Sequence, residues 1–259
     1  MILTPFIKLP ILKRLMPSFA KRYFKLIGKN NFITKYENIK IIINLNEPMD
    51  QLIYFQKNYE KKQVNFLLKQ IKKLEPSFFI DVGANSGIYS LLVGKSYPKI
   101  KIFSFEPIKK TFEVLKKNIS INNFKNQIKI FNVGLSNKIC ELKMKAQIKN
   151  GYIQKGGFGV ANKKDDLRFL HKETAKFITG DSKLKIKNKK IFLKIDVEGH
   201  EIYALEGLKK LLKNNNIFLQ IEIFDKNFKK TNLLLKKNNF KPINKIFSDG
   251  KTDYFYSNF

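Results

Sequence analysis

The sequence predicts an α/β fold built on a mostly parallel sheet, and three features indicate it. Short apolar strands alternate with helical periodicity along residues 59–237, and the apolar strand 78–82 runs directly into a glycine turn. The tail carries two strand-like runs, 243–247 and 254–259, separated by the turn signal Ser248-Asp249-Gly250. Strands that alternate with helices form parallel sheets, so we expect such a sheet with an antiparallel hairpin at its edge.

The elements follow one another in a regular order. Residues 39–45 are rich in isoleucine and predict a strand, and residues 59–74 predict a helix that stops before Pro76. Further strands are expected at 78–82, 100–105, 127–133, 191–197 and 217–224, and helices at 87–95, 109–118, 202–213 and 227–237. Residues 138–190 break this rhythm with a polar, glycine-containing stretch. We interpret that stretch as an insertion that borders the site, within a domain of residues 59–259.

Residues 1–58 are expected to form an N-terminal accessory segment with a basic amphipathic helix and a strand. Residues 1–36 contain no acidic side chain, and their lysines and arginines alternate with apolar residues. Such a helix packs on the domain, which we favour, or contacts an anionic membrane peripherally through residues 1–30. No stretch reaches the roughly 18 apolar residues that span a bilayer.

The net charge of +30 comes from 51 basic and 21 acidic residues. Only three of the basic residues are arginines, and the lysines are spread along the whole chain, which indicates a compositional bias. Arginine is the planar side chain that reads phosphate and guanine, so we expect no nucleic-acid partner. The lone Cys140 excludes an internal disulfide and fits a reducing, cytoplasmic compartment.

The segment from Phe79 to Gly87 combines a buried strand with a glycine turn that opens a helix. Gly83 permits a tight turn and close approach of a ligand to the backbone, and amides at a helix start attract anionic groups. Asp81 lies two residues before Gly83. The Gly-Ala-Asn-Ser-Gly spacing differs from the G-x-G-x-x-G of dinucleotide sites, which counts against an NAD-dependent oxidoreductase.

Two further segments place acidic residues where strands end. Glu106 ends the strand in Phe103-Ser104-Phe105-Glu106-Pro107, where a carboxylate can accept both hydroxyls of a ribose. Leu193 to Glu201 contributes Asp196, Glu198 and His200 to the end of a later strand. Ligands bind at the carboxyl ends of open parallel sheets. Glu198 and Glu201 could instead cap the following helix.

Together these segments resemble the FkbM family of methyltransferases, whose motifs FIDVGANSGIYS, FSFEP, LKIDVEGHE and LQIEIF occur here in family order within residues 60–225. The resemblance implies the Rossmann-like class I methyltransferase fold, a mostly parallel seven-stranded sheet with a C-terminal antiparallel hairpin and helices on both faces. It also implies S-adenosylmethionine as cofactor. The family acts typically as O-methyltransferases on hydroxyls of sugars, glycans or related small metabolites.

The resemblance also implies roles for residues. Gly83, Ala84, Asn85 and Gly87 would hold the methionine end of the cofactor, and Asp81 would support its amino group. Glu106, next to Pro107, would bind the ribose. The segment 133–136, ending at Ser136, would border the adenine, although Gly134 makes that assignment a loose one.

Methyl transfer to an alcohol needs a base, and His200 is the natural candidate. Asp196 could orient the acceptor or the cofactor amine. Asp196, Glu198 and Glu222 could also form an oxygen site for a hard cation, but we expect no metal.

Two other functions stay open. An RNA or DNA methyltransferase is favoured by the charge, but the chain lacks Asn-Pro-Pro-Tyr, Asp-Pro-Pro-Tyr and Pro-Cys motifs. The second open function is that of a protein that binds the cofactor without catalysing a reaction.

Overall fold

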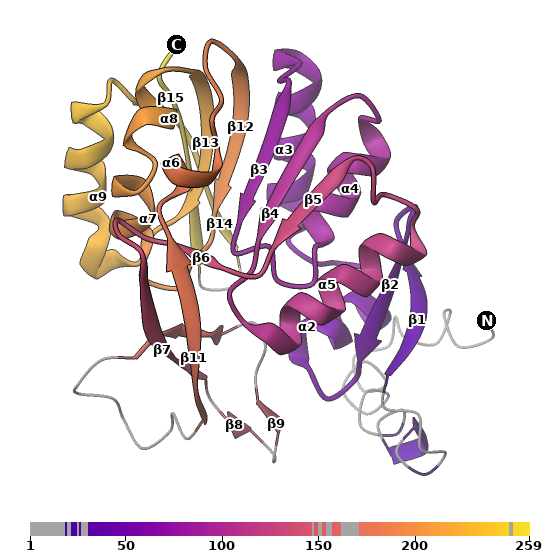
Figure 1. Cartoon of the computed structure of the whole chain (residues 1–259). Coiled ribbons are helices and arrows are strands. Elements are labelled where there is room, and N and C mark those ends of the chain that lie inside the picture. The colour runs from indigo at the N-terminus through magenta and orange to yellow at the C-terminus, as the bar shows by residue number, and fades with distance from the viewer. Residues whose placement is uncertain are drawn as a thin grey trace.

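The computed structural model describes residues 31–146, 148–149, 152–153, 157–161, 171–248 and 251–259, together with residues 19, 22–24 and 26 (Figure 1). The predicted basic helix of residues 1–30 therefore lies largely outside the described residues. Within the described part of the chain, no helix is both long and apolar enough to cross a bilayer.

The centre of the molecule is a seven-stranded sheet in the order β14-β15-β13-β12-β3-β4-β5. Its strands are β3 (Phe78–Val82), β4 (Lys101–Phe105), β5 (Ile128–Phe131), β12 (Lys190–Ile195), β13 (Asn216–Glu222), β14 (Lys241–Ser248) and β15 (Lys251–Ser257). β15 runs antiparallel to both of its neighbours, and the remaining pairs are parallel. This arrangement confirms the predicted α/β, mostly parallel sheet with its C-terminal hairpin.

Helices cover both faces of this sheet (Figure 1). One face packs against α3 (Lys61–Leu74), α4 (Ile88–Ser96) and α5 (Lys109–Ile121), and the other against α7 (Glu201–Glu206), α8 (Lys209–Lys213) and α9 (Asp225–Lys237). Successive strand residues alternate between the two cores: Phe192 belongs to the first, whereas Leu193 belongs to the second. A strand buried on both faces reads as a continuous apolar run, which is why these strands were predictable.

One predicted helix is broken in two. The pattern at 202–213 becomes α7 and α8, separated at Gly207. A Cβ on Gly207 would lie 2.0 Å from the backbone oxygen of Ser136, so a glycine is needed where the two segments touch. A short helix α6 (Gly180–Lys183) packs beside α8.

The N-terminal segment packs on the same domain. β1 (Asn31–Tyr36) and β2 (Ile39–Asn44) form a hairpin, of which only the second strand was predicted. Buried isoleucines of β2 share a core with α4 and α5, and the Ile42 amide donates to the Asn118 side chain at 2.8 Å. A short α2 (Pro48–Gln51) and the π-helix η2 (Leu52–Gln56) continue toward α3.

The interrupted region 138–190 contains most of a second, four-stranded sheet in the order β10-β7-β11-β6. Its strands are β6 (Gly134–Leu135), β7 (Cys140–Ala146), β10 (Gly159–Val160) and β11 (His171–Ile178), and a small hairpin of β8 (Ile148–Lys149) and β9 (Tyr152–Ile153) follows β7. No strand was predicted here, although residues 140–146 alternate between apolar and polar side chains as a half-buried strand does.

Candidate active site

A cavity of about 360 Å³ opens at the carboxyl ends of β3, β4, β12 and β13. Its walls include the glycine turn, the residues after β4, and the acidic ends of β12 and β13. Such a volume lies within the range of ligand pockets, and the carboxyl edge of a parallel sheet is where ligands bind. The N-terminal segment closes one side through residues 47–50 and Leu52, next to Tyr59 and Glu60.

The glycine turn is shaped by contact with the neighbouring strand end. Gly83 has φ +83°, and a Cβ there would lie 1.8 Å from the backbone oxygen of Asp196. Ala84 and Asn85 line the cavity. Gly87 has φ +87° and donates its amide to the Ala84 oxygen at 2.8 Å, so it forms the turn and does not line the cavity. The turn therefore needs glycine at both ends: both residues have a positive φ, and Gly83 also lies too close to the Asp196 oxygen to carry a Cβ.

Glu106 lies directly opposite this turn. Its Oε2 accepts the Asn85 amide and its Oε1 the Ile108 amide, both at 2.9 Å. Burial raises the pKa of Glu106 to about 7, although both backbone amides favour the ionised form. Pro107 also lines the cavity. The structure thus brings the two predicted cofactor segments together, while their binding role stays a prediction.

Asp81 occupies a different place. It is fully buried beneath α4, where its Oδ2 accepts the Ser90 hydroxyl at 2.7 Å, and it does not line the cavity. Burial raises its pKa, and the nearby Lys194 opposes the rise. Its contact with a cofactor amine stays a prediction, and in this structure its observed partner is the helix.

His200 lines the cavity and forms a pair with Ser136. The His200 Nε2 lies 3.0 Å from the Ser136 Oγ, and the His200 ring stacks on Tyr203 with centroids 4.7 Å apart. Burial lowers the pKa of His200 to about 4, so the ring is neutral at neutral pH. Gly134 and Leu135 line the same cavity, whereas Ser136 lines a second one.

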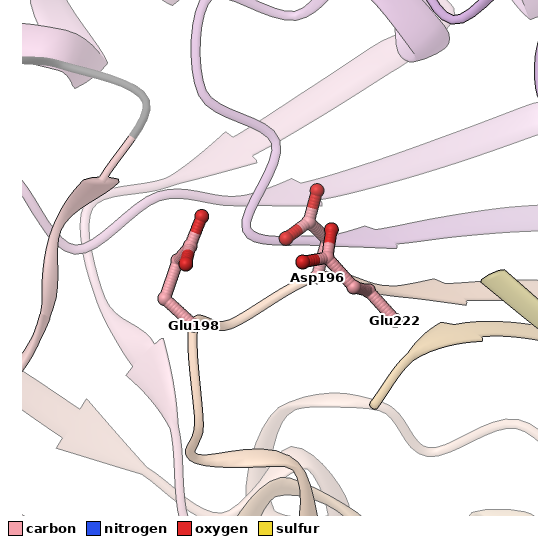
Figure 2. Close-up of side chains that lie close together, drawn as sticks. All are labelled: Asp196, Glu198 and Glu222. Carbon is pink, nitrogen blue, oxygen red and sulfur yellow. The ribbon is translucent and has the colours of Figure 1, made fainter. Parts of the chain in front are cut away.

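The three carboxylates of Asp196, Glu198 and Glu222 converge on one space (Figure 2). One oxygen of each lies within 4.8 Å of the others. Burial raises the pKa of Glu198 to about 7 and of Glu222 to about 8, and the charge of Asp196 adds to both rises. Burial also opposes ionisation of Asp196, but Lys194 and Lys251 outweigh it and hold the pKa of Asp196 below its ordinary value.

Two lysines that sequence reasoning missed complete this cluster. Lys194 is buried, with its Nζ 3.2 Å from the Asp196 Oδ2 and 4.6 Å from the centre of the Tyr89 ring. Lys251 Nζ lies 3.1 Å from both the Glu198 Oε1 and the Glu222 Oε1. A lysine inside the apolar strand 190–195 was a usable signal for Lys194. Lys251 follows a turn in a lysine-rich tail, and nothing in the sequence distinguishes it.

A second cavity, of about 690 Å³, adjoins the first. The two share Val160, Glu198, His200 and Lys251 as wall residues. The second cavity is bounded further by β7 and β10 and by Tyr203 and Phe224. Residues between 138 and 190 therefore line both cavities.

The methyltransferase FkbM domain matches residues 81–242, which is more than half of the chain. The chain belongs to the FkbM methyltransferase family. Methyltransferase sdnD of Sordaria araneosa is 28% identical over 155 residues, which cover 51% of this chain and 60% of that protein. Methyltransferase 1 of Beauveria bassiana is 26% identical over 155 residues, or 52% of this chain and 59% of that protein.

The chain spans about three fifths of the length of these two relatives. Among solved structures, the FkbM methyltransferase of Methylobacillus flagellatus KT superposes with a TM-score of 0.49 at 17% identity. That superposition covers 71% of this chain and 44% of the other.

Proposed function

We propose that this FkbM-family protein transfers a methyl group from S-adenosylmethionine to a hydroxyl oxygen of a sugar, glycan or small metabolite. The observation that carries the proposal is the meeting of Glu106 with the glycine turn in one cavity at the carboxyl edge of the sheet. Family membership supplies the reaction class.

The residues present fit an adenosyl cofactor. A Cβ on Gly83 would collide with the backbone oxygen of Asp196, so the glycine turn lies in close contact with the end of β12. The Asn85 Oδ1 is buried and has no hydrogen-bond partner among the described residues, so it offers an acceptor to a bound amine or hydroxyl. Glu106 keeps lone pairs free beyond its two amide bonds, and these would accept ribose hydroxyls. When bound, S-adenosylmethionine supplies an electrophilic methyl on a sulfonium.

The cavity also supports an acceptor without negative charge. At least eight of the chain's 21 acidic residues line it, but only two of its 51 basic residues do so among the described positions. A phosphate brought into this wall would meet those carboxylates that are ionised, Asp196 among them, which disfavours a nucleic-acid acceptor. Hydroxyls, in contrast, can donate to carboxylates.

His200 is the proposed base. Its neutral ring lines the cavity and is oriented by its bond to Ser136, but a pKa of about 4 makes it a weaker proton acceptor than an ordinary histidine. Placing the acceptor oxygen about 3–3.5 Å from the methyl carbon would supply much of the rate. We expect His200→Ala to bind cofactor normally and to slow transfer by about 10²–10⁴-fold. Unchanged turnover would remove His200 from the mechanism and leave Glu198 and Glu222, with pKa values of about 7 and 8, as bases.

The cofactor part is tested by calorimetric titration with S-adenosylhomocysteine. Glu106→Gln should weaken binding by about tenfold to a hundredfold, because a charge-assisted pair of hydrogen bonds is lost. Glu113→Gln, an exposed position on α5, is the matched control and should bind like the unaltered protein. No complex with the unaltered protein would refute the proposal.

The acceptor part is tested by a cofactor-consumption screen that pairs neutral sugars and glycans with their phosphorylated counterparts. Transfer to the neutral member of a pair supports the proposal. Preference for RNA or phosphorylated acceptors, with a steep dependence on salt, would support a nucleic-acid enzyme instead. Tight cofactor binding without transfer to any acceptor would support a non-catalytic protein.

A further inference from the structure

Lys251 comes from a part of the chain that the family match does not include. The matched domain ends at residue 242, whereas Lys251 begins β15 in the C-terminal hairpin. The hairpin nevertheless brings its ammonium into the candidate active site. Lys251 lines both cavities.

The ammonium of Lys251 bridges two of the three converging carboxylates. Its Nζ lies 3.1 Å from the Glu198 Oε1, 3.1 Å from the Glu222 Oε1 and 3.2 Å from the Glu222 Oε2. The third carboxylate, Asp196, has Lys194 as its own cation at 3.2 Å. Each carboxylate of the cluster is therefore in contact with a lysine.

Without Lys251, only Lys194 among the described residues would remain beside these three carboxylates, in contact with Asp196. Glu198 and Glu222 would be left without that cation. Three carboxylate oxygens within 4.8 Å of one another can surround an ion at the usual oxygen–metal distances of about 2.0–2.6 Å. An ion bound to the Glu198 Oε1 would, however, lie within about 6 Å of the Lys251 Nζ, since the two cations would be separated by at most the 3.1 Å contact plus one oxygen–metal distance. Repulsion between the two cations would then oppose metal binding.

We propose that Lys251 is the built-in cation of this cluster: it positions Glu198 and Glu222 at the cavity and occupies the role that a divalent metal would otherwise fill. Lys251 is thus a positioning residue, and the cluster binds no divalent metal while its ammonium is present. The proposal rests on the contacts of Lys251 and does not depend on methyl transfer, so the two can fail separately.

The test is a titration of the full chain with Mn²⁺, followed by electron paramagnetic resonance of the free ion. The unaltered protein should show no saturable site up to about 1 mM. Lys251→Met keeps most of the side-chain volume and removes the charge. It should gain one Mn²⁺ site that binds at least about tenfold more tightly than this limit of about 1 mM. Adding Glu222→Gln to Lys251→Met should abolish that site.

Two controls make the result specific. Lys245→Met removes an exposed lysine from the neighbouring β14 and should leave the chain without a Mn²⁺ site. Lys251→Arg retains a positive charge and should also bind no Mn²⁺. Circular dichroism and thermal melting show that each variant is folded, and Lys251→Gln replaces Lys251→Met if the latter does not fold.

Either of two results would overturn the proposal. The first is saturable Mn²⁺ binding by the unaltered protein that Glu222→Gln weakens, because the cluster would then take metal despite Lys251. The second is a folded Lys251→Met or Lys251→Gln variant that gains no site, because the lysine would then not be what keeps metal out.

Discussion

At the scale of single residues, the unusual feature is a row of polar side chains inside the central sheet. Ser104, Asp81, Lys194 and Gln220 lie on four adjacent strands in exact register. All four are buried beneath the α3 and α4 side of the sheet. Buried charges persist only when they are paired, so Lys194 compensates the nearby carboxylates of Asp81 and Asp196.

This arrangement predicts a large stability effect at Lys194. Lys194→Met should lower the free energy of unfolding by about 3–5 kcal/mol, because buried Asp81 would lose its nearby cation and Asp196 would keep only Lys251 of its two nearby lysines. Lys101→Met, at an exposed position on β4, should change it by less than about 0.5 kcal/mol. Urea denaturation measures both. Equal stability of the two variants would show that the buried acids need no cation.

His200 predicts a loss of stability in acid. Burial lowers its pKa in the folded protein to about 4, whereas an unfolded histidine titrates near 6.5. The unfolded chain therefore takes up a proton first as the pH falls. The stability that the neutral ring contributes is complete above about pH 6.5 and is lost progressively toward pH 4.

The measurement compares urea unfolding of the unaltered protein and His200→Gln between about pH 4 and pH 7. Over this range the unaltered protein should lose up to about 1.4 kcal/mol more per pH unit than the variant does. Parallel pH profiles would mean that His200 titrates normally in the folded protein.

At the scale of elements, the site is built where strands end and the backbones of neighbouring elements touch. The turn after β3 meets the end of β12 at Gly83, and the α7–α8 junction meets Ser136 at Gly207. Both contacts position residues of the site. Gly83 lines the cavity, and Ser136 forms the hydrogen bond with His200. Close backbone contact therefore fixes the geometry of the site.

Gly83→Ala should disrupt this contact. Its Cβ would meet the Asp196 oxygen at 1.8 Å, and the positive φ adds strain. We expect a loss of at least about 2 kcal/mol in stability together with loss of S-adenosylhomocysteine binding. Gly157→Ala is the matched control, since a Cβ there has no neighbour within 4 Å. A Gly83→Ala variant that is stable and binds normally would contradict the close approach.

At the scale of the whole molecule, charge is divided between the surface and the cavity. Most lysines lie on the outside, while acidic side chains gather in the cavity. Among the described residues of the N-terminal segment, Phe24 stacks on Phe32 with centroids 4.5 Å apart. Phe19, Tyr23 and Leu26 are instead exposed. This segment therefore combines a packed aromatic residue with apolar side chains available for another contact.

Peripheral membrane contact stays a prediction for this segment. The membrane alternative predicts that the full chain sediments with vesicles that contain anionic lipid and that deletion of residues 1–30 abolishes this sedimentation, whereas the favoured packing on the domain predicts none. Vesicles of neutral lipid are the control for charge. Equal sedimentation of the full and truncated chains would exclude a role for residues 1–30.

Local sequence patterns determined the main sheet of this protein and the order of its elements. β3 was predicted at its observed bounds, and the other central strands differ by a few residues at their ends. Burial on both faces makes such strands continuous apolar runs, and a glycine turn followed by a strand-ending acid marks a ligand edge. These signals lie within a few neighbouring residues, so the sequence alone displays them.

Only the tertiary structure decided which charges meet. Lys251 reaches Glu198 and Glu222 across 53 and 29 positions of sequence, and the pairing of β7 with β11 joins segments of the insertion that are similarly distant. In a lysine-rich chain, the residues next to a lysine in the sequence do not indicate which carboxylate it will contact. The packing of the hairpin against the sheet determines that contact. The position of Asp81 under α4 was decided in the same way, by a helix whose direction the sequence pattern does not specify.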